Sequence, residues 1–514
     1  MSFTEDKFRA TLREENAGFQ GMGGEKVQPT PDTMPARPED EKLGLFANVA
    51  YGIQHILTMY GGIVAVPLIV GQAAGLAPAD IGLLITASLF AGGVATILQT
   101  MGLPFFGCQL PLVQGVSFAG VATMITISGN GGIQAVFGAV IAASFIGLLI
   151  TPIFARITKF FPPLVAGIVI TTIGLTLMPV AGRWAMGGNS RAENFGSAEN
   201  ILLAGVTLAI VLILSKLGNA TISRLSILLA LVAGTAIAWM LGMTDFSQVA
   251  NGPVMALPDL FHFGWPTFGT AAILSMFIVI LVTLVETSAD IFAVGEIVGT
   301  KVDSRRLGDG LRADMLSSML APAVGSFTQS AFAQNVGLVA VTGVKSRYVV
   351  ATGGVILVCL GLLPVMGRVV ATIPMPVLGG AGIVLFGTVT ASGIRTLAKV
   401  NYQGNMNLII VATSIGFGTL PIMLPEFYHH FPTWVQTIFH SGISSSAIMA
   451  IVLNLMFNYF TAGNSEQPSV FGAAAERVIR YTDLSQLRDG DYYLDGKMFD
   501  ADGKEIQLIP VGGH

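Results

Sequence analysis

The sequence predicts an all-α polytopic membrane protein with about fourteen membrane-spanning segments, and three observations support this fold class. Hydrophobic residues make up 53% of the 514 residues and charged residues only 11%, whereas roughly a quarter of a soluble protein is charged. Apolar runs, each close to the ~20 residues that a span requires, follow one another from about Leu43 to Phe460. Glycine, which lets membrane helices approach closely, occurs 62 times. Lipid is therefore the expected main solvent of the chain.

The apolar runs set the order of the predicted spans. Their expected starts lie near Leu43, Ile81, Leu112, Ile133, Pro163, Ala198, Leu225, Thr270, Leu311, Ala333, Val349, Pro376, Met406 and Val435. These spans form a first half over about residues 43–243 and a second half over about 267–462. Two polar tails flank them, and we expect both to be cytoplasmic.

The N-terminal tail, residues 1–42, has no apolar stretch of the kind found in a secretory signal peptide, so we expect it to be disordered. The C-terminal tail, residues 463–514, contains Asp-Gly steps at 489–490, 495–496 and 502–503. Such steps between apolar residues favour hairpin turns. They predict a small β-element.

Lysine and arginine are distributed unevenly between the predicted loops. With the N-terminus inside, the cytoplasmic loops carry twelve of them and the external loops three. The twelve are Arg156, Lys159, Lys216, Arg224, Lys301, Arg305, Arg306, Arg312, Lys345, Arg347, Arg395 and Lys399, and the three are Arg183, Arg191 and Arg368. This asymmetry agrees with the positive-inside rule. An error of one span would place every later loop on the opposite side of the membrane, so the asymmetry supports both the number of spans and their orientation.

Two distant connectors resemble each other. GLL at 147–149, Arg156 and PPLVAG at 162–167 match GLL at 361–363, Arg368 and PMPVLG at 374–379. Seven predicted spans separate the copies, so they lie in opposite orientations. Inverted repeats are typical of secondary transporters, which bind cargo near the midplane where broken helices meet. A chance match of two amphipathic connectors is the alternative.

A carboxylate pair lies deep in the span that begins near Thr270. Glu286 and Asp290 are four residues apart and therefore share one helical face. Ionisable groups inside a membrane are costly and usually functional. We expect one of them to bind the cargo and the other to handle a proton or cation; a structural pair that locks two helices is the alternative.

Two polar, interrupted segments begin short apolar runs in the two halves. Residues 325–337 contain Gln334 and Asn335, and residues 109–118 contain Ser117 and Phe118. Irregular backbone at membrane depth persists only where protein or a cavity satisfies its polar groups. We therefore predict a short strand leading into a half-helix in each segment. An amide offers a donor and an acceptor to a heterocycle, and Phe118 could stack on a planar ring; capping and ordinary packing are the alternatives.

Three further polar residues fall inside predicted spans. Gln54 and His55 lie in the first, where the histidine could carry a proton or bridge helices, and Asp314 lies just inside the ninth. Asp314 could be a coupling carboxylate or an interfacial partner of Arg312. The spacing of His, Cys and acidic residues matches no metal site and no nucleophile–base set, so we expect no metal, no cofactor and no enzymatic activity. The formal charge of −4 argues against nucleic acid as a partner.

The run QNVGLVAVTGVKSR at 334–347 resembles the signature of the nucleobase–ascorbate transporter family. Glu286, the Gln54-His55 pair and Asp314 fall where that family has its other marked residues, and the resemblance extends over about residues 43–460. It implies two inverted sets of seven spans, a core domain that moves against a gate domain as an elevator, and a homodimer in the bacterial inner membrane.

The same resemblance implies roles for individual residues. Glu286 and Gln334 would hydrogen-bond a base, and Phe118 would lie against its ring. Asp290, Asp314 and His55 would serve coupling or the architecture of the site. Glutamine at 334 resembles the branch that takes up xanthine or uric acid with H⁺, Na⁺ being less expected. Ser117, where some xanthine-selective members have asparagine, leaves the choice between the two purines open.

Two other cargoes stay open beside an oxidised purine. A uracil permease of the same family is one alternative, although that branch tends to have glutamate at the position of Gln334. An anion transporter of the same fold is the other, and Glu286 and Asp290 argue against it because their field would repel an anion.

Overall fold

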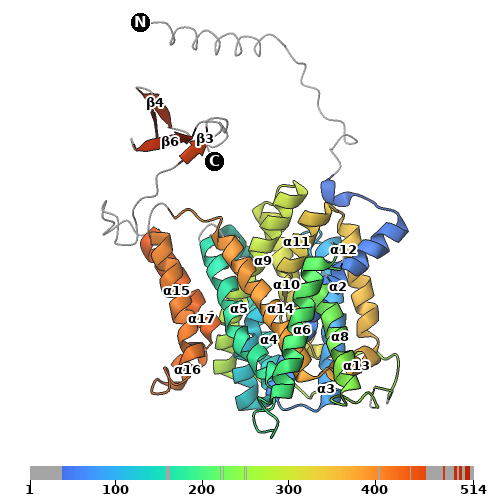
Figure 1. Cartoon of the computed structure of the whole chain (residues 1–514). Helices are drawn as coiled ribbons and strands as arrows, with labels where there is room; N and C mark the ends of the chain where they lie inside the picture. Colours follow the sequence, from blue (N-terminus) through green and yellow to red (C-terminus); the bar gives the residue numbers. More distant parts are fainter. Residues whose placement is uncertain are drawn as a thin grey trace.

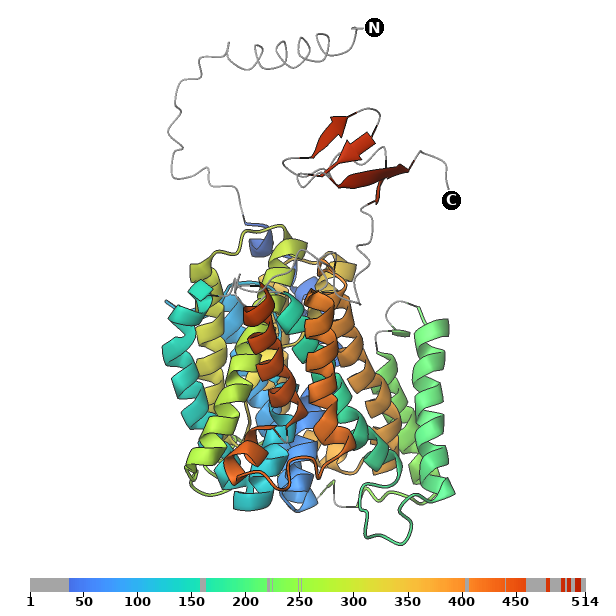
Figure 2. The ribbon, with the colours of Figure 1, turned by 90° about the vertical axis from the view of Figure 1, so that its left-hand side faces the viewer.

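The computed structural model describes most of the chain. The described residues are 37–157, 163–219, 222–223, 225–247, 249–250, 252–402, 406–439, 441–458, 478–480, 491–494, 497–500 and 504–509. Within them, helices form one body and four short strands form a small separate sheet (Figures 1 and 2).

The helical body contains two short strands among its helices. In chain order its elements are η2 (Pro38–Asp40), α2 (Leu45–Ala73), α3 (Pro78–Met101), β1 (Gln114–Val116), η3 (Phe118–Gly120), α4 (Val121–Ile157), α5 (Pro163–Ala185), α6 (Ala198–Leu217), α8 (Ser226–Met240), α9 (Thr270–Val298), α10 (Ser304–Leu320), η5 (Ala321–Val324), β2 (Gln329–Ala331), α11 (Ala333–Thr342), α12 (Arg347–Gly361), α13 (Pro364–Ala371), α14 (Met375–Leu397), α15 (Met406–Met423), α16 (Thr433–Phe439) and α17 (Gly442–Asn458). Five expected span starts, at Pro163, Ala198, Thr270, Ala333 and Met406, coincide with helix starts.

Among the described residues, eight helices are long and apolar enough to cross a membrane, and α12 with α13, bent by 78°, would be a ninth. The chain is thus a mostly helical polytopic membrane protein. α4 is broken at Gly132, whose φ of 69° and ψ of −174° are not helical, so it consists of two helices, and the second begins at the expected span start near Ile133. α10 begins seven residues before the expected Leu311, because the Asp303 side chain caps it by accepting from the Arg306 N–H at 2.8 Å.

The two interrupted segments meet as strands, which confirms that prediction. β1 and β2 pair antiparallel, with Gln114 opposite Ala331 and Val116 opposite Gln329. Two further backbone bonds extend the pairing, since the Ser117 N–H donates to Thr328 at 2.8 Å and Phe332 donates to Val113 at 3.0 Å. This ladder satisfies backbone groups that would otherwise be costly inside a membrane.

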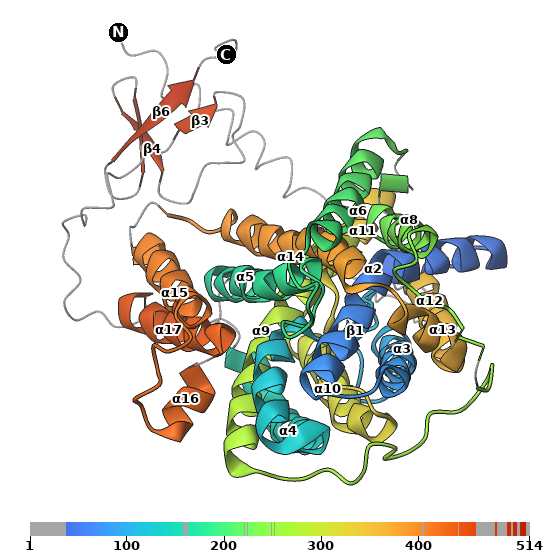
Figure 3. The ribbon, with the colours of Figure 1, turned by 60° about the horizontal axis from the view of Figure 1, so that its bottom comes forward.

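α5 and α14 pack side by side through small residues (Figure 3). A β-carbon added at Gly174 would lie 2.1 Å from Thr390 Oγ1, and one added at Gly393 would lie 2.3 Å from the Thr171 nitrogen. Only glycine therefore allows this approach, as is usual where membrane helices pack closely.

The last residues of the predicted N-terminal tail are ordered, so the expectation of disorder is wrong for this part. Glu39 is fully buried and accepts from Arg306 at 2.5 Å, and Asp40 accepts from Arg347 Nε at 2.6 Å. The same arginine donates to the carbonyl of Thr100 at 3.0 Å. The two ion pairs join η2 to α10 and α12, and the bond to Thr100 joins Arg347 to α3. The buried carboxylate of Glu39 needs such a charged partner.

The predicted C-terminal β-element is present as β3 (Val478–Arg480), β4 (Tyr492–Leu494), β5 (Lys497–Phe499) and β6 (Glu505–Ile509), in the order β3-β6-β5-β4. β4 and β5 form an antiparallel hairpin in which Leu494 lies opposite Lys497. The three Asp-Gly steps themselves lie outside the described residues. The sheet and η2 lie on the same side of the helical body (Figures 1 and 2).

Candidate functional site

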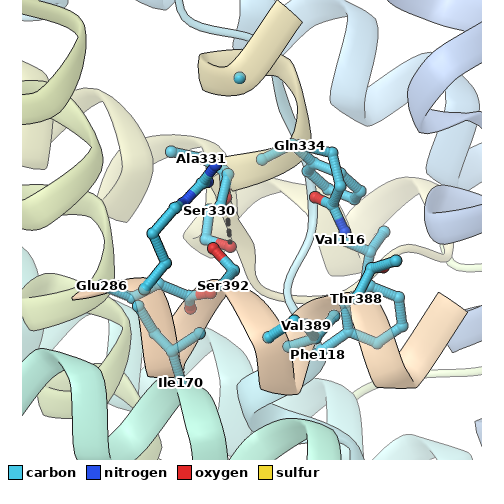
Figure 4. A pocket seen from close by; sticks show the side chains of 15 residues that line it. Val116, Phe118, Ile170, Glu286, Ser330, Ala331, Gln334, Thr388, Val389 and Ser392 are labelled. Carbon is cyan, nitrogen blue, oxygen red and sulfur yellow. Dashed lines mark hydrogen bonds between the residues drawn. The ribbon is translucent and has the colours of Figure 1, made fainter. Parts of the chain in front are cut away.

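A cavity of about 360 Å³ lies where β2 and α11 face α14. We call its first side the strand wall, formed by residues of β1, η3, α9, β2 and α11: Val116, Phe118, Glu286, Ser330, Ala331, Phe332, Ala333, Gln334 and Gly337. We call its second side the helix-pair wall, formed by residues of α5 and α14: Ile170, Thr388, Val389, Ala391, Ser392 and Arg395. Figure 4 shows Glu286 and Ser392 at one end of the cavity and Phe118, Gln334 and Thr388 at the other.

Glu286 supplies the carboxylate of the strand wall. It lies in the middle of α9 and is buried, and its Oε2 accepts no hydrogen bond from the described residues. A buried carboxylate oxygen without a donor is costly. The cavity therefore offers an acceptor that a ligand N–H group could satisfy.

Phe118 and Gln334 lie at the other end of the cavity. The Phe118 ring packs edge-on against Phe386 of α14, with ring centroids 6.0 Å apart, and this contact joins the two walls. It also lies 6.3 Å from the Phe332 ring. Gln334 is the second residue of α11, and its side chain extends into the cavity (Figure 4). An aromatic face and an amide are thus available to one ligand.

Ser117 and Asn335, expected to contact the ligand, do not line this cavity. The Ser117 Oγ caps η3 by accepting from the Ala119 N–H at 3.2 Å. Asn335 is fully buried, and its Nδ2 donates to the His55 carbonyl at 2.9 Å and lies 3.1 Å from His55 Nδ1. This geometry favours the helix-bridging interpretation of His55, because the pair joins α11 to α2. Gln54, the neighbour of His55, is half-buried and also does not line the cavity.

Asp314 is fully buried behind the strand wall. Its Oδ2 accepts from Thr287 Oγ1 at 2.6 Å, and the Ala331 N–H donates to the same hydroxyl at 3.4 Å. Thr287 follows Glu286 on α9, so this chain of contacts connects α10, α9 and β2. The charges of Asp314, Glu286 and Asp290 also interact with one another. Asp314 is thus not an interfacial partner of Arg312, which binds Asp309.

A second cavity, of about 800 Å³, adjoins the first and shares Ala333, Gly337, Ser392 and Arg395 with it. We call it the vestibule. Asp290 lies in its wall, and Glu296 and Lys399 lie 3.8 Å apart in it. It runs along α9 toward the end at which Thr300 contacts Glu39 of η2 at 3.4 Å. The cavity therefore opens on the face of the molecule that carries η2.

The helix-pair wall contains the residues that sequence analysis missed. Thr388, Ser392 and Arg395 are spaced by four and three residues on α14, so they form one polar stripe on an otherwise apolar helix. This helical spacing of polar residues is the feature of the sequence that could have identified them as cavity residues. The predicted residues all came from the strand wall and its support. Among the described residues, no group of three or more His, Cys, Asp or Glu side chains could hold a metal ion.

Solved membrane transporters share this fold. The transmembrane domain of a cyanobacterial bicarbonate transporter, BicA, superposes with a TM-score of 0.54 at 16% identity, over 81% of this chain and all of that one. The inward-facing structure of murine Slc26a9, an anion transporter, gives a TM-score of 0.55 at 11% identity, over 87% of this chain and 74% of that one. At these identities the similarity concerns the fold alone.

Sequence comparison identifies the family. The model of the Permease family matches residues 46–427. The chain is 39% identical to the uric acid transporter UacT of Escherichia coli, over 82% of this chain and 89% of that protein, and 38% identical to the xanthine permease of Bacillus subtilis, over 81% and 95%. It is also 39% identical to the uric acid permease PucK of Bacillus subtilis, over 79% and 94%. These relatives are permeases rather than enzymes, and the chain belongs to their family, the nucleobase–ascorbate transporters that its signature resembles.

Proposed function

We propose that this protein is a secondary active transporter that takes up an oxidised purine, xanthine or uric acid, together with a proton. The observation that supports it most is the convergence of Glu286, Gln334 and Phe118 on one cavity in a chain whose relatives include uric acid and xanthine permeases.

The cavity suits a planar, polar ring. Phe118 offers an aromatic surface against which a purine packs. Gln334 offers a donor and an acceptor for an N–H/C=O edge. Glu286 accepts a ring N–H, which satisfies the oxygen that has no protein donor. Loss of an N–H or C=O group from the base leaves a buried polar group unpaired, and such losses are costly enough to give selectivity.

The three interacting carboxylates support coupling to a cation. Glu286, Asp290 and Asp314 lie in or behind the same wall, and three like charges in a low-dielectric region cannot all ionise at low cost. A proton taken up by one of them lowers this cost and permits the base to bind. Thr287 donates to Asp314 and accepts from the Ala331 N–H of β2. Protonation of Asp314 would change the first of these hydrogen bonds and so affect the position of β2, which lines the binding cavity.

We further infer fourteen spans in two inverted repeats of seven, over about residues 43–243 and 267–462. The antiparallel pairing of β1 and β2 supports the inversion, because equivalent strands of inverted repeats run in opposite directions. In an elevator mechanism the core domain, which includes the strand wall, moves against a gate domain that includes α5 and α14. The vestibule gives the base an exit on the face that carries η2.

The cellular arrangement is also a proposal. The positive-inside distribution of lysine and arginine and the common side of η2 and the C-terminal sheet support two cytoplasmic termini in the bacterial inner membrane. We expect a homodimer built on the gate domain.

Uptake of radiolabelled xanthine into cells that express this chain tests the proposal, with unlabelled uric acid, hypoxanthine, guanine and uracil as competitors. We expect competition by xanthine and uric acid and none by uracil. A protonophore should abolish uptake while replacement of Na⁺ by choline should not; the opposite result would make Na⁺ the coupling ion. Uptake of labelled uracil with no uptake of labelled xanthine or uric acid would favour the uracil alternative, and uptake of bicarbonate or sulfate with no purine uptake would favour the anion transporter.

A further inference from the structure

Arg395 is a charged residue of the cavity that the binding mode above does not use. It lies on α14 and lines both the binding cavity and the vestibule. Its side chain is exposed to these spaces and forms no hydrogen bond or ion pair with any described residue. The charge of Asp290, on the opposite wall of the vestibule, does interact with it.

Several other cations of the described structure have partners that explain them. Arg306 binds Glu39 and Arg347 binds Asp40, and Arg368 donates to the carbonyls of Val249 and Pro253 at 2.9 and 3.0 Å. Lys399, four residues after Arg395 on the same side, lies 3.8 Å from Glu296 at the outer end of the vestibule. The guanidinium of Arg395 therefore has its donors available in the cavity.

Charge balance indicates what these donors could bind. Glu286 gives the cavity a negative field that would repel an anion, yet uric acid is the stronger acid of the two purines and loses a ring proton below neutral pH, so that it is mostly an anion at neutral pH. The resulting anion has its charge spread over an N–C–O edge. A guanidinium matches such a planar edge with two parallel N–H donors.

We propose that Arg395 binds the anionic edge of urate while Glu286 binds an N–H group on the other side of the ring, so that the cavity accepts uric acid as its monoanion. Arg395 is then the residue that determines specificity for urate over the more weakly acidic xanthine. This inference rests on the proposed function, and it names the ionic form of the cargo. The two walls then contribute opposite charges, and the base bridges them.

The test compares Arg395→Gln, Arg395→Lys and Lys399→Gln with wild type, after surface expression is equalised. Inhibition constants of uric acid and of xanthine are measured against whichever labelled purine the wild type carries, at neutral pH. Loss of a charge-assisted hydrogen bond should weaken urate by about tenfold to hundredfold in Arg395→Gln, with xanthine changed by less than about threefold. Arg395→Lys keeps the positive charge but loses the two parallel N–H donors of the guanidinium, so its inhibition constant for urate should lie between those of wild type and Arg395→Gln. Lys399→Gln, with the same change of charge in an exposed pair, should resemble wild type.

Equal weakening of both purines in Arg395→Gln would overturn the inference, because it would indicate a general structural role. Unchanged urate inhibition in either Arg395 variant would overturn it as well. If Arg395→Gln does not reach the membrane, a urate-to-xanthine ratio in Arg395→Lys equal to that of wild type decides against it. A wild type that carries neither purine would refute the proposed function itself, and that outcome is distinct from all of these.

Discussion

The two walls of the cavity hold their functional groups in different ways. The strand wall fixes them with hydrogen bonds that cross between elements, such as Thr287 with Asp314 and Asn335 with His55. The helix-pair wall holds its helices by close backbone approach at Gly174 and elsewhere. Its polar side chains bond within their own helix or not at all, as when Thr388 donates to the Leu385 carbonyl at 2.6 Å.

This difference concerns how rigidly each wall holds its polar groups. Hydrogen bonds between elements make the strand wall a rigid unit, because each loss would leave a buried polar group unsatisfied. The helix-pair wall offers a tightly packed surface with few such bonds across the cavity. In the proposed elevator mechanism, the strand wall moves as one hydrogen-bonded unit past the helix-pair wall, and contacts of the cargo with the helix-pair wall, such as the one proposed for Arg395, break during the movement.

The largest effect should follow from loss of the acceptor on the strand wall. Glu286→Gln should reduce uptake by at least about a hundredfold, because the amide can neither release a proton nor accept the ring N–H as a carboxylate does. Labelled purine uptake at equal surface expression measures this. Glu296→Gln, on the same helix in an exposed pair with Lys399, should transport normally. Normal uptake by Glu286→Gln would remove this residue from the mechanism.

A smaller but still large effect should follow from breaking the support behind the same wall. Thr287→Val removes the hydroxyl that binds Asp314 and leaves a buried carboxylate without that donor. The maximal rate should fall by about tenfold, while the KM changes little because neither residue lines the cavity.

Thr283→Val is the matched control for Thr287→Val. Thr283 lies four residues earlier on α9, is equally buried, and donates to Val279 of its own helix at 3.0 Å. We expect near-normal uptake from it. If both variants lose activity equally, the loss reflects burial on α9 and not the contact with Asp314.

The same contrast explains which parts of the site the sequence revealed. Glu286, Gln334 and Asp314 were identifiable because polar residues inside apolar runs are rare. The interruptions before Phe118 and Gln334 predicted the strands. The direction of each side chain could not be predicted, because Ser117 and Asn335 belong to the same segments as the cavity residues and differ from them only in the face that they present.

The helix-pair wall was harder to predict from sequence. The starts of its spans were predicted to within one residue, at Pro163 for α5 and Pro376 for α14, but Arg395 was assigned to a cytoplasmic loop, whereas it lies in the last turn of α14. Sequence pattern places a residue near a helix end without showing which cavity lies beside it. The sequence also did not reveal that η2 is ordered, because Glu39 and Arg306 are far apart in sequence and become partners only in the folded chain.

The helix-pair wall should respond to substitution chiefly in stability. A methyl group at Gly174 would overlap Thr390 and force α5 and α14 apart, so Gly174→Ala should destabilise the protein by about 1–3 kcal/mol. A lower melting temperature in detergent would show this. Gly416→Ala, on α15 where no atom lies within 4 Å of the added carbon, should leave it unchanged or slightly higher. Equal melting temperatures would mean that the pair does not depend on this contact.

The smallest effect should come from the neutral hydroxyl groups of the polar stripe on the helix-pair wall. Ser392 lies beside Glu286 (Figure 4), and its hydroxyl bonds to no described residue, so it is available to the cargo. Ser392→Ala should raise the KM for the purine by about twofold to tenfold with an unchanged maximal rate, since a neutral hydrogen bond contributes about 0.5–1.5 kcal/mol. Thr388→Val removes a hydroxyl whose proton is already used within α14 and should change the KM by less than about twofold. A fall in maximal rate for Ser392→Ala, as large as that for Thr287→Val, would mean that both walls act on the transport step and that the division between them is wrong.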